Sequence, residues 1–444
     1  MSEKNFTTIS PEFDKSVKID FTGETVTSNA GVMMLAELDD KLGIIGGIAS
    51  RLSDPRNPDF TVHSMHGLLA QRLFCIAAGY EDGDDADDLR HDPAMRSATG
   101  RKNEDAVLAS QPSISRLEGN LLLIGGNLDV IKVSNLDAAI MYYKMKGAKH
   151  LWLDADSYES PVHGEQEGSA YNGYYRSDCY HPLVLHDGFG FKLKVELRSG
   201  NEYTSTGAVA FLEPVFQRLI AEGFKLHLTA DSGFAAPDIF GLCERHRVIY
   251  YIRMRSNDVL QGAAEHLLYR PPGRPPKGPL VRYAGFQYKA GAWDCSRRVV
   301  AKATHNPGEL FAEIYFLITN SPVLNKEAFK LYGKRRGRAE QRNDEGKNMM
   351  FSTRLSCHKE KANDVRLQLY TLAYNLMVLF RRLTLTGDDK KWTLNTIRLR
   401  LIKIGARATH GARYTRFLFA AGPALQRLVA NIFNRISRLP EPCR

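Results

Sequence analysis

The sequence has few cysteines and no long hydrophobic run. Its 444 residues include six cysteines, which lie far apart and form no CxxC pair and no Cys/His cluster with the spacing of zinc ligands. This scarcity indicates a reducing compartment and argues against structural zinc. The first residues show no basic segment followed by an apolar one, as a secretory signal would. The most apolar stretch, residues 367–380, is shorter than the roughly 20 residues that span a bilayer. We therefore expect a cytoplasmic protein with no membrane segment.

The composition indicates a globular protein of more than one domain. Of all residues, 43% are hydrophobic and 25% are charged, which is enough apolar material for a buried core. A chain of this length exceeds one ordinary domain. The local pattern divides it into a mainly helical segment at 1–147, a mixed β and α segment at 148–255, a β-rich insertion at 256–310, a return to the mixed segment at 311–380 and a basic helical region at 381–444.

The positive charge is concentrated in the last of these segments. The net charge is +10, and residues 381–444 carry fourteen lysines and arginines against three acidic residues. Among the basic residues lie Trp392, Tyr414, Phe417 and Phe419. Such a mixture favours a polyanionic partner, because each phosphate that is neutralised releases counterions. A solvated helical face is the alternative that charge alone leaves open.

Residues 148–255 predict strands and helices in a specific order. Three strand patterns are followed by a helix, a strand, a second helix and a fifth strand, at 149–156, 179–188, 189–200, 207–223, 225–234, 237–247 and 248–254. This is the element order of an RNase H-like fold, in which the first and fourth strands lie side by side. We therefore expect an α/β protein with an RNase H-like core, a β-rich insertion and helical regions flanking the core at both ends.

Carboxylates stand at the ends of the first and fourth strands. Asp154 and Asp156 are two residues apart and point to the same side of the sheet, and Asp231 ends the fourth strand. Glu340, on a strongly polar helix, would face them. Carboxylates that converge without cysteine or histidine ligands suit Mg²⁺ or Mn²⁺. Two such ions about 4 Å apart promote phosphodiester hydrolysis. Any one aspartate is ordinarily a strand cap, so the inference depends on the whole set.

The polar helix is predicted over residues 326–355. On it Tyr332, Arg336, Glu340 and Lys347 are spaced by four, four and seven residues, so they share one face. Lys347 would neutralise a phosphate beside the scissile bond, and Arg336 would act on the same face.

These motifs resemble those of the DDE transposases of bacterial insertion sequences, transposase DDE domain group 1, in the insertion-sequence thirteen-eighty family. The resemblance is carried by "LDADS", "HGEQEG", "TADSGF" and "YGKRRGRAEQRNDEGK", together with "DFTGETVTSNAG", "LAQRLFCIAAGYED", "LRHDP", "PSISRLE" and "RSGN". These stretches extend over most of the chain. Each is unspecific alone, and the combination is highly specific.

The resemblance implies a catalytic triad of Asp156 or Asp154 with Asp231 and Glu340. A hydroxyl residue usually follows the first acid in such transposases. Because Ser157 follows Asp156, this favours Asp156 as the catalytic aspartate and leaves Asp154 as a neighbouring or alternative metal ligand.

The resemblance also implies a tyrosine-arginine-glutamate-lysine signature at Tyr332, Arg336, Glu340 and Lys347. The expected spacing from the tyrosine fits Arg335, whereas the spacing to the glutamate fits Arg336. Both arginines are therefore candidates to bind DNA, together with Tyr332 and Lys347.

Two further groups are weaker candidates. The helix start "PSISRLE" carries Ser115 and Arg116, which suit phosphate and base contacts, although an ordinary capped helix explains them equally well. Glycines around His163, Glu165 and Glu167 indicate a tight loop beside the metal ligands, with simple turn structure as the alternative.

One tryptophan, Trp293, lies in the insertion. An exposed indole there would stack on a base displaced at a DNA end, so we include Trp293 among the DNA-binding candidates. The competing interpretation is a core tryptophan of a small β unit.

We therefore expect a DNA transposase. Residues 1–147 would bind the terminal inverted repeats, and the core would cut the element ends with two Mg²⁺ or Mn²⁺ ions and join the 3′-hydroxyls to target DNA. The expected partners are double-stranded DNA and a second copy of the chain, with no membrane and no small-molecule cofactor, in the bacterial cytoplasm and on the nucleoid when DNA is bound. The alternatives are an inactive repressor derived from a transposase and a metal-dependent nuclease that does not join.

Overall fold

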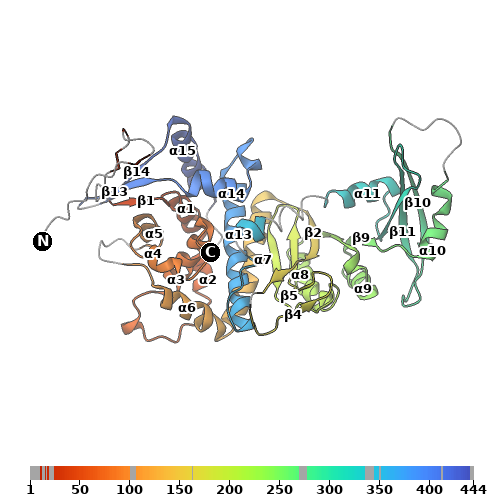
Figure 1. Cartoon of the computed structure of the whole chain (residues 1–444), viewed down its shortest axis with the longest axis horizontal. Helices are drawn as coiled ribbons and strands as arrows, with labels where there is room; N and C mark the ends of the chain where they lie inside the picture. The colour runs from red at the N-terminus through yellow and green to blue at the C-terminus, as the bar shows by residue number, and fades with distance from the viewer. Residues whose placement is uncertain are drawn as a thin grey trace.

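The computed structural model describes residues 11–12, 16, 18–19, 25–100, 107–162, 164–269, 278–335, 345–349, 352–411 and 414–440. Within these ranges, eight strands form one mixed sheet (Figure 1). They are β2 (His150–Ser157), β6 (Leu183–Asp187), β7 (Lys192–Glu196), β8 (Lys225–Ala230), β9 (Ile249–Met254), β10 (Leu280–Tyr288), β11 (Arg297–His305) and β12 (Glu313–Thr319). Their order across the sheet is β10-β11-β12-β9-β8-β2-β6-β7.

The element order predicted for 148–255 is confirmed. After β2, β6 and β7 come α8 (Ala208–Ala221), β8, α9 (Pro237–Arg245) and β9. The first and fourth predicted strands, β2 and β8, are parallel neighbours, with Leu153 opposite Leu228 and Ala155 opposite Ala230. Beside the end of β2 lies a small sheet of β3 (Ser160–Pro161), β4 (Ala170–Asn172) and β5 (Ser177–Tyr180). The chain therefore has a mixed α/β fold built on a large mixed sheet.

Helices cover both faces of the large sheet. On one face α9 packs through Phe240, whose ring stacks on Tyr250 at 5.5 Å, and α8 lies beside it. The opposite face carries Tyr251, which packs with Ala328 of α11 (Asn325–Gly333). The aspartates of β2 point to this second face, because Asp154 pairs with Thr229 and Thr229 pairs with Tyr251.

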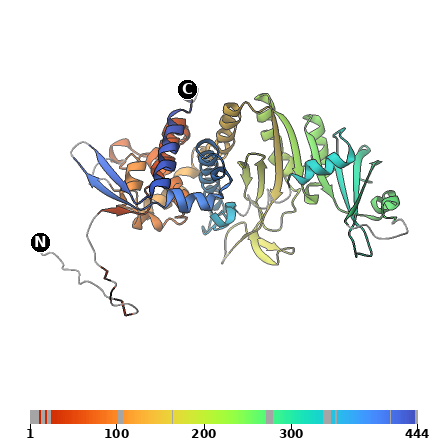
Figure 2. The same ribbon diagram turned by 90° about the horizontal axis from the view of Figure 1, so that it is seen from above.

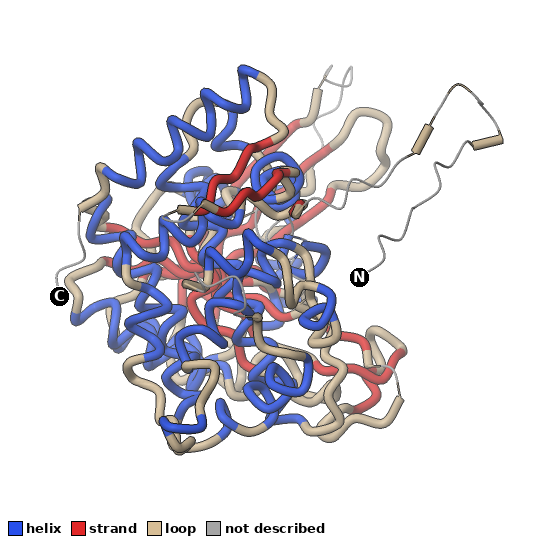
Figure 3. The backbone as a smooth tube through the Cα atoms, turned by 90° about the vertical axis from the view of Figure 1, so that its left-hand side faces the viewer, coloured by secondary structure: helices blue, strands red, loops and turns tan. Residues whose placement is uncertain are grey.

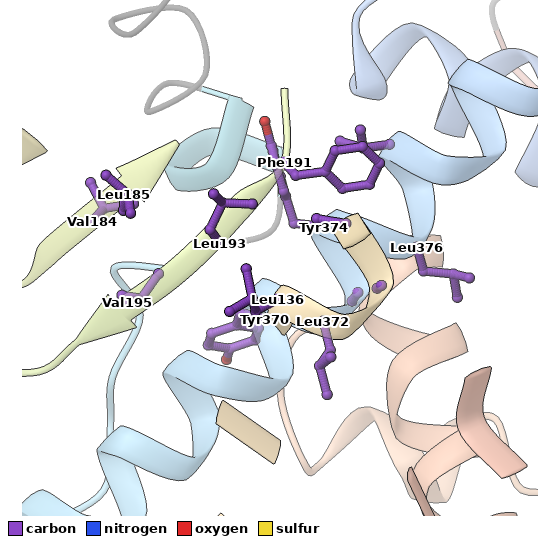
Figure 4. Packing of buried hydrophobic residues seen from close by; sticks show 14 of the residues in the cluster. Leu136, Val184, Leu185, Phe191, Leu193, Val195, Tyr370, Leu372, Tyr374 and Leu376 are labelled. Atoms are coloured by element: carbon purple, nitrogen blue, oxygen red, sulfur yellow. The ribbon is translucent and has the colours of Figure 1, made fainter. Parts of the chain in front are cut away.

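The long helix α13 (Glu360–Thr384) lies between the sheet and the N-terminal helices (Figures 1 and 4). Its side chains are buried around most of its circumference, as the apolar run at 367–380 predicts. The buried amide of Asn375 exchanges hydrogen bonds with the backbone of Lys192 (2.9 and 2.8 Å) and donates to Asn135 (2.9 Å), which joins α13 to β7 and to α7 (Asn127–Lys146). No helix in the described part of the chain is both long and apolar enough to cross a bilayer.

The first part of the chain is helical, as predicted. It consists of the short strand β1 (Val26–Thr27) and of α1 (Val32–Leu42), α2 (Ile44–Ala49), η1 (Pro58–Phe60), α3 (Met65–Ala78), α4 (Asp85–Asp88), α5 (Pro93–Ala98), α6 (Gln111–Gly119), η2 (Leu121–Leu123) and α7 (Asn127–Lys146). Helix α3 begins where the Ser64 hydroxyl accepts a hydrogen bond from the Gly67 amide and ends at Gly79, whose φ of 94° suits glycine.

The region at 381–444, predicted to be helical, also contains a β-hairpin. This region contains η6 (Asp389–Lys391), α14 (Leu394–Ile397), η7 (Arg398–Ile402), the hairpin β13 (Ala406–His410) and β14 (Thr415–Phe419), and α15 (Pro423–Ser437). Strand β13 also pairs with β1, so the two ends of the chain share a sheet. Figure 2 shows this sheet and α15 beside the N-terminal helices, at the end of the molecule away from β10, and Figure 3 views the molecule from that end.

Residues 256–310, predicted to form a β-rich insertion, contribute α10 (Asp258–Ala263), η4 (Glu265–Leu267), β10 and β11. The two strands extend the large sheet through β12, which pairs with β9. The insertion therefore adds to the edge of the central sheet, and the limits of separate domains stay a prediction.

The single polar helix predicted over 326–355 is also corrected. Helix α11 ends at Gly333, and a π-helical turn, η5, occupies Glu345–Met349. The residues from 352 to the start of α13 form turns and irregular backbone. The stretch 336–344, with Arg336 and Glu340, lies outside the described residues.

Candidate active site

The structure brings the predicted aspartates to the ends of neighbouring strands. Ala155 pairs with Ala230 in the parallel ladder. Asp156 and Asp231 are the next residues, so both lie at the C-terminal ends of these neighbouring strands. Asp154 precedes them on the same face as Asp156. The parallel pairing of the first and fourth predicted strands thus brings Asp156 and Asp231 to neighbouring strand ends.

Asp154 is the most buried of these acids, with 6% of its surface exposed. The hydroxyl of Thr229 donates a hydrogen bond to its Oδ1 (3.1 Å), and Nε of Arg335 donates to the same oxygen. Burial raises the pKa of the Asp154 carboxyl to about 6, and the nearby Arg335 charge opposes this rise. Asp154 therefore depends on a neighbouring cation to keep its charge.

Arg335 bridges both aspartates of β2. Beside its bond to Asp154, its Nη2 lies 3.4 Å from Oδ1 of Asp156, which also accepts from the Ser157 amide (3.0 Å). Burial lowers the pKa of Arg335, but the two carboxylates outweigh it and raise the pKa above its usual value. A positive group between two carboxylates marks a position that attracts cations.

Asp231 is fixed by the start of a short helical turn. It caps η3 (Ser232–Phe234), and its Oδ1 accepts a hydrogen bond from the Gly233 amide at 2.8 Å. The turn lies against Thr204, whose hydroxyl is 3.4 Å from that of Ser157. Asp231 is only partly buried.

The predicted signature is only partly visible. Tyr332 lies in the last turn of α11, partly buried beside Arg335, and burial raises the pKa of its hydroxyl. Lys347 lies in η5, and its side chain is outside the described part of the structure, as are Arg336 and Glu340. The described residues alone hold no group of three or more acidic, histidine or cysteine side chains that would enclose a metal ion.

Although 336–344 is not described, the residues that follow it are anchored. Glu345 forms a buried ion pair with Arg381 of α13 (3.2 Å) and accepts from the Leu394 amide (3.4 Å). A side chain at Gly346 would collide with the ammonium group of Lys192, so η5 lies close to β7. Local patterns carry no signal for the role of Glu345, because its partner lies 36 residues away.

The tight-loop candidates lie at the small sheet. The Glu167 amide donates to the His358 carbonyl (2.9 Å), and its carboxylate accepts from the Glu360 amide (3.3 Å) at the start of α13. Glu165 is exposed, and His163 lies outside the described residues. The contacts of Glu167 favour a structural role in holding α13 over the metal-site role that the sequence suggested.

The remaining DNA-binding candidates differ in exposure. Ser115 and Arg116 are exposed on α6, and Arg116 Nε donates to the Pro112 carbonyl (3.1 Å). Trp293 is 7% exposed and packs edge-on against Phe240 at 5.4 Å. This burial favours the core interpretation of Trp293 over the stacking role.

Two residues beside the aspartates, Trp152 and Lys334, were not among the candidates selected from the sequence. Trp152 precedes Asp154 by two residues on β2, and the Nζ of Lys334 lies 5.6 Å from its ring centroid. The strand alternation that placed the two aspartates on one face also places Trp152 there, so the signal was present.

The exposed hairpin face at the C-terminal end carries basic residues. Arg407 pairs with Leu418, and Thr409 pairs with Arg416, so both arginines project from the same side of the hairpin, and both are exposed. Arg427 is exposed on α15. Part of the charge concentration seen in the sequence therefore lies at the surface, whereas Arg381 and Arg398 are buried.

The chain was also compared with known proteins. A family model described as "Transposase DDE domain group 1" matches residues 9–441. No curated protein matches the chain significantly.

Proposed function

Because the chain belongs to the transposase DDE domain group 1 family, whose members are transposase enzymes that act on DNA, we propose that it mobilises an insertion sequence. It would bind the terminal inverted repeats, cut the element ends and join the freed 3′-hydroxyls to target DNA. The observation that carries this proposal is the position of Asp156 and Asp231 at the ends of neighbouring parallel strands, with the Arg335 guanidinium between Asp156 and Asp154.

We propose that the core is RNase H-like. The strand order β7-β6-β2-β8-β9, with the last three strands parallel, places the first and fourth core strands side by side. Helices α8 and α9 cross over on one face and leave the aspartate face to α11 and α13. The support for this proposal is the order and direction of the strands, which agree with the expected convergence of the acids.

DDE transposases generally use divalent metal ions, and the residues present suit Mg²⁺ or Mn²⁺. The ligands on the two strands are carboxylate oxygens, and the Arg335 guanidinium stands where positive charge is stabilised. Asp156, Asp231 and Glu340, with Asp154 beside them, would hold the ions. When bound, such ions supply the Lewis-acid chemistry of phosphodiester cleavage.

The chain's own residues would position the DNA. The Gly233 amide and Ser157 amide orient the carboxylates of Asp231 and Asp156 before DNA arrives. Arg335, which lies at the aspartates, would also be placed to neutralise a backbone phosphate, and Lys347 would act similarly. Two ends must be paired for transposition, so we propose a homodimer on DNA.

The proposal is tested with the protein, Mg²⁺ and DNA that flanks its own gene. Cut ends at the element boundaries, and joined products from pre-cut ends, are the expected results. Cutting without joining would favour the nuclease alternative. Specific binding without any cutting would favour a repressor derived from a transposase.

The basic hairpin is expected to supply non-specific DNA affinity. Replacing Arg407, Arg416 and Arg427 with glutamine should weaken binding to random DNA and reduce the dependence of log K on log salt by about 0.9 for each phosphate that is no longer neutralised. Affinity is measured by fluorescence anisotropy over a salt series. Deleting the chain from Lys390 onward would be a poor test of this charge. The deletion would also remove Ile432 and Ile436, which are buried on α15, and α15 packs on α1. An unchanged slope in the folded triple variant would contradict the assignment.

Arg116 is expected to contribute to recognition of the element ends. Arg116→Ala should lower the preference for an end over random DNA by about 1–3 kcal/mol if the guanidinium reads a base edge. The change is made at an exposed side chain, so the fold should persist. Competition binding with end and random duplexes measures the ratio, and Ser115→Ala provides a neighbouring comparison. An equal loss on both DNAs would assign Arg116 to a phosphate contact.

A further inference from the structure

An aromatic platform lies on the aspartate face of the sheet. The Trp152 ring stacks on His227 with centroids 4.5 Å apart and planes 12° apart, and it also stacks on Tyr251 at 5.7 Å. His227 lies on β8 and Tyr251 on β9, so both support Trp152 from the same side of β2. These two ring contacts hold the indole against the neighbouring strands.

Trp152 also lines a cavity of about 270 Å³. Its lining comes from β2, from the turn after β6, and from the end of α11, and includes His150, Trp152, Gly188, Phe189, Leu331 and Lys334. The turn is fixed because Nε of Arg382 donates to the Phe189 carbonyl at 2.7 Å. The volume lies below the roughly 300–1,000 Å³ of pockets for drug-sized ligands, so it suits a single planar ring system.

The rim of this cavity carries positive charge. Lys334 lies over the Trp152 ring, and Arg335 lies at the boundary between the cavity and the aspartates. A planar aromatic group with an attached phosphate would satisfy both features, because the ring meets the indole and the phosphate meets the cations.

The cavity is continuous with the candidate active site. Asp154 lines it, and Trp152 lies two residues earlier on the same strand, which is about 6.6 Å away at the rise of a β-strand. A DNA strand whose phosphate lies at the aspartates would therefore present a neighbouring base to Trp152.

We propose that this cavity receives one unstacked nucleobase of the DNA end, with Trp152 as the stacking surface and Lys334 at the adjoining phosphate. The inference rests on the proposed function and adds a subsite to it. It assigns the stacking role, expected of Trp293 from the sequence, to a tryptophan on the catalytic strand.

The test is a double-mutant cycle between the protein and the DNA in metal-free buffer. End duplexes carrying an abasic site at each successive position are bound to the wild type and to Trp152→Ala. At one position the abasic site should weaken wild-type binding about tenfold and have no effect on the variant. Trp152→Phe should restore the sensitivity. Tyr174→Ala, which removes an 86% exposed aromatic ring elsewhere, is the matched control and should leave it unchanged.

A second variant covers the case in which Trp152→Ala does not fold. A Cβ at Gly188 would lie in ordinary contact with Trp152 (3.5 Å), so Gly188→Leu should narrow the cavity and abolish the same sensitivity. If the wild type binds and cuts element ends but shows no position-specific coupling to Trp152 or Gly188, the base subsite is refuted while the transposase proposal stands. If the wild type does not distinguish ends from random DNA, the proposed function itself fails.

Discussion

Asp231→Ala is expected to abolish cleavage of the element ends while DNA binding survives. Asp231 is the acid contributed by the neighbouring strand, and its position is fixed by the Gly233 amide. If Asp231 is a metal ligand, as proposed, the rate should fall by more than the roughly 100-fold that loss of a residue supporting a metal ligand costs. Binding should persist or tighten, since a negative charge near the phosphates is removed.

The measurement uses a labelled element end with Mg²⁺ or Mn²⁺, alongside a separate binding assay and a check of folding. Asp238→Ala, at an exposed acid on α9, is the matched control and should cut normally. For the first strand, Asp156→Ala should abolish cleavage and Asp154→Ala should reduce it. Cutting by Asp231→Ala at the wild-type rate would overturn the assignment of the metal site. If Asp154 proves essential and Asp156 does not, only the choice within the pair fails.

Glu118→Ala is expected to cause the largest loss of stability. Glu118 lies on α6 with a nearly inaccessible side chain, and it pairs with Arg72 of α3 (2.6 Å) and with Arg366 of α13 (2.8 Å). Removing the carboxylate leaves two arginines, one of them fully buried, without their shared counter-charge. Loss of one partner from a buried ion pair typically costs about 3–5 kcal/mol.

Urea unfolding of the purified variant measures the change in free energy, if the transition is cooperative. The control is Asp388→Ala, which removes a 92% exposed partner of Lys391 and is expected to change stability little. A loss below about 1 kcal/mol for Glu118→Ala would mean that the arginines find other partners or water, and that the cluster is not a main support of the helical domain.

The sequence predicted those features that depend on local periodicity. The alternation in β2 placed Asp154 and Asp156 on one face, and the order of strands and helices placed Asp231 beside them. Both predictions follow from chain geometry, since side chains alternate along a strand and a helical crossover makes neighbouring strands parallel. The same alternation also predicts that Trp152 lies on the face of the sheet that carries Asp154 and Asp156.

Features that depend on distant pairing were not predictable in this way. The hairpin β13–β14 does not stand out as β in the sequence, because small alanines, Ala406 and Ala408, fill its buried face and give a weak alternating signal. The bridge from Arg335 to Asp154 joins positions 181 residues apart. Trp293 was ambiguous because its exposure depends on Phe240, which lies on α9, far from it in the sequence. Tertiary packing decided each of these cases.

Helix α13 fixes the separation between the N-terminal helices and the large sheet. At about 1.5 Å per residue its 25 residues extend for roughly 37 Å, and along this length it contacts α3 and α6 on one side and β7 on the other. Helix α6, which carries Arg116, and the sheet, which carries the aspartates, therefore pack on the same helix. If α6 and the aspartates act on the same DNA end, the cut should fall at a fixed number of base pairs from the sequence that α6 contacts. Inserting base pairs between the repeat and the boundary would then leave the cut at the old distance and move it off the element end.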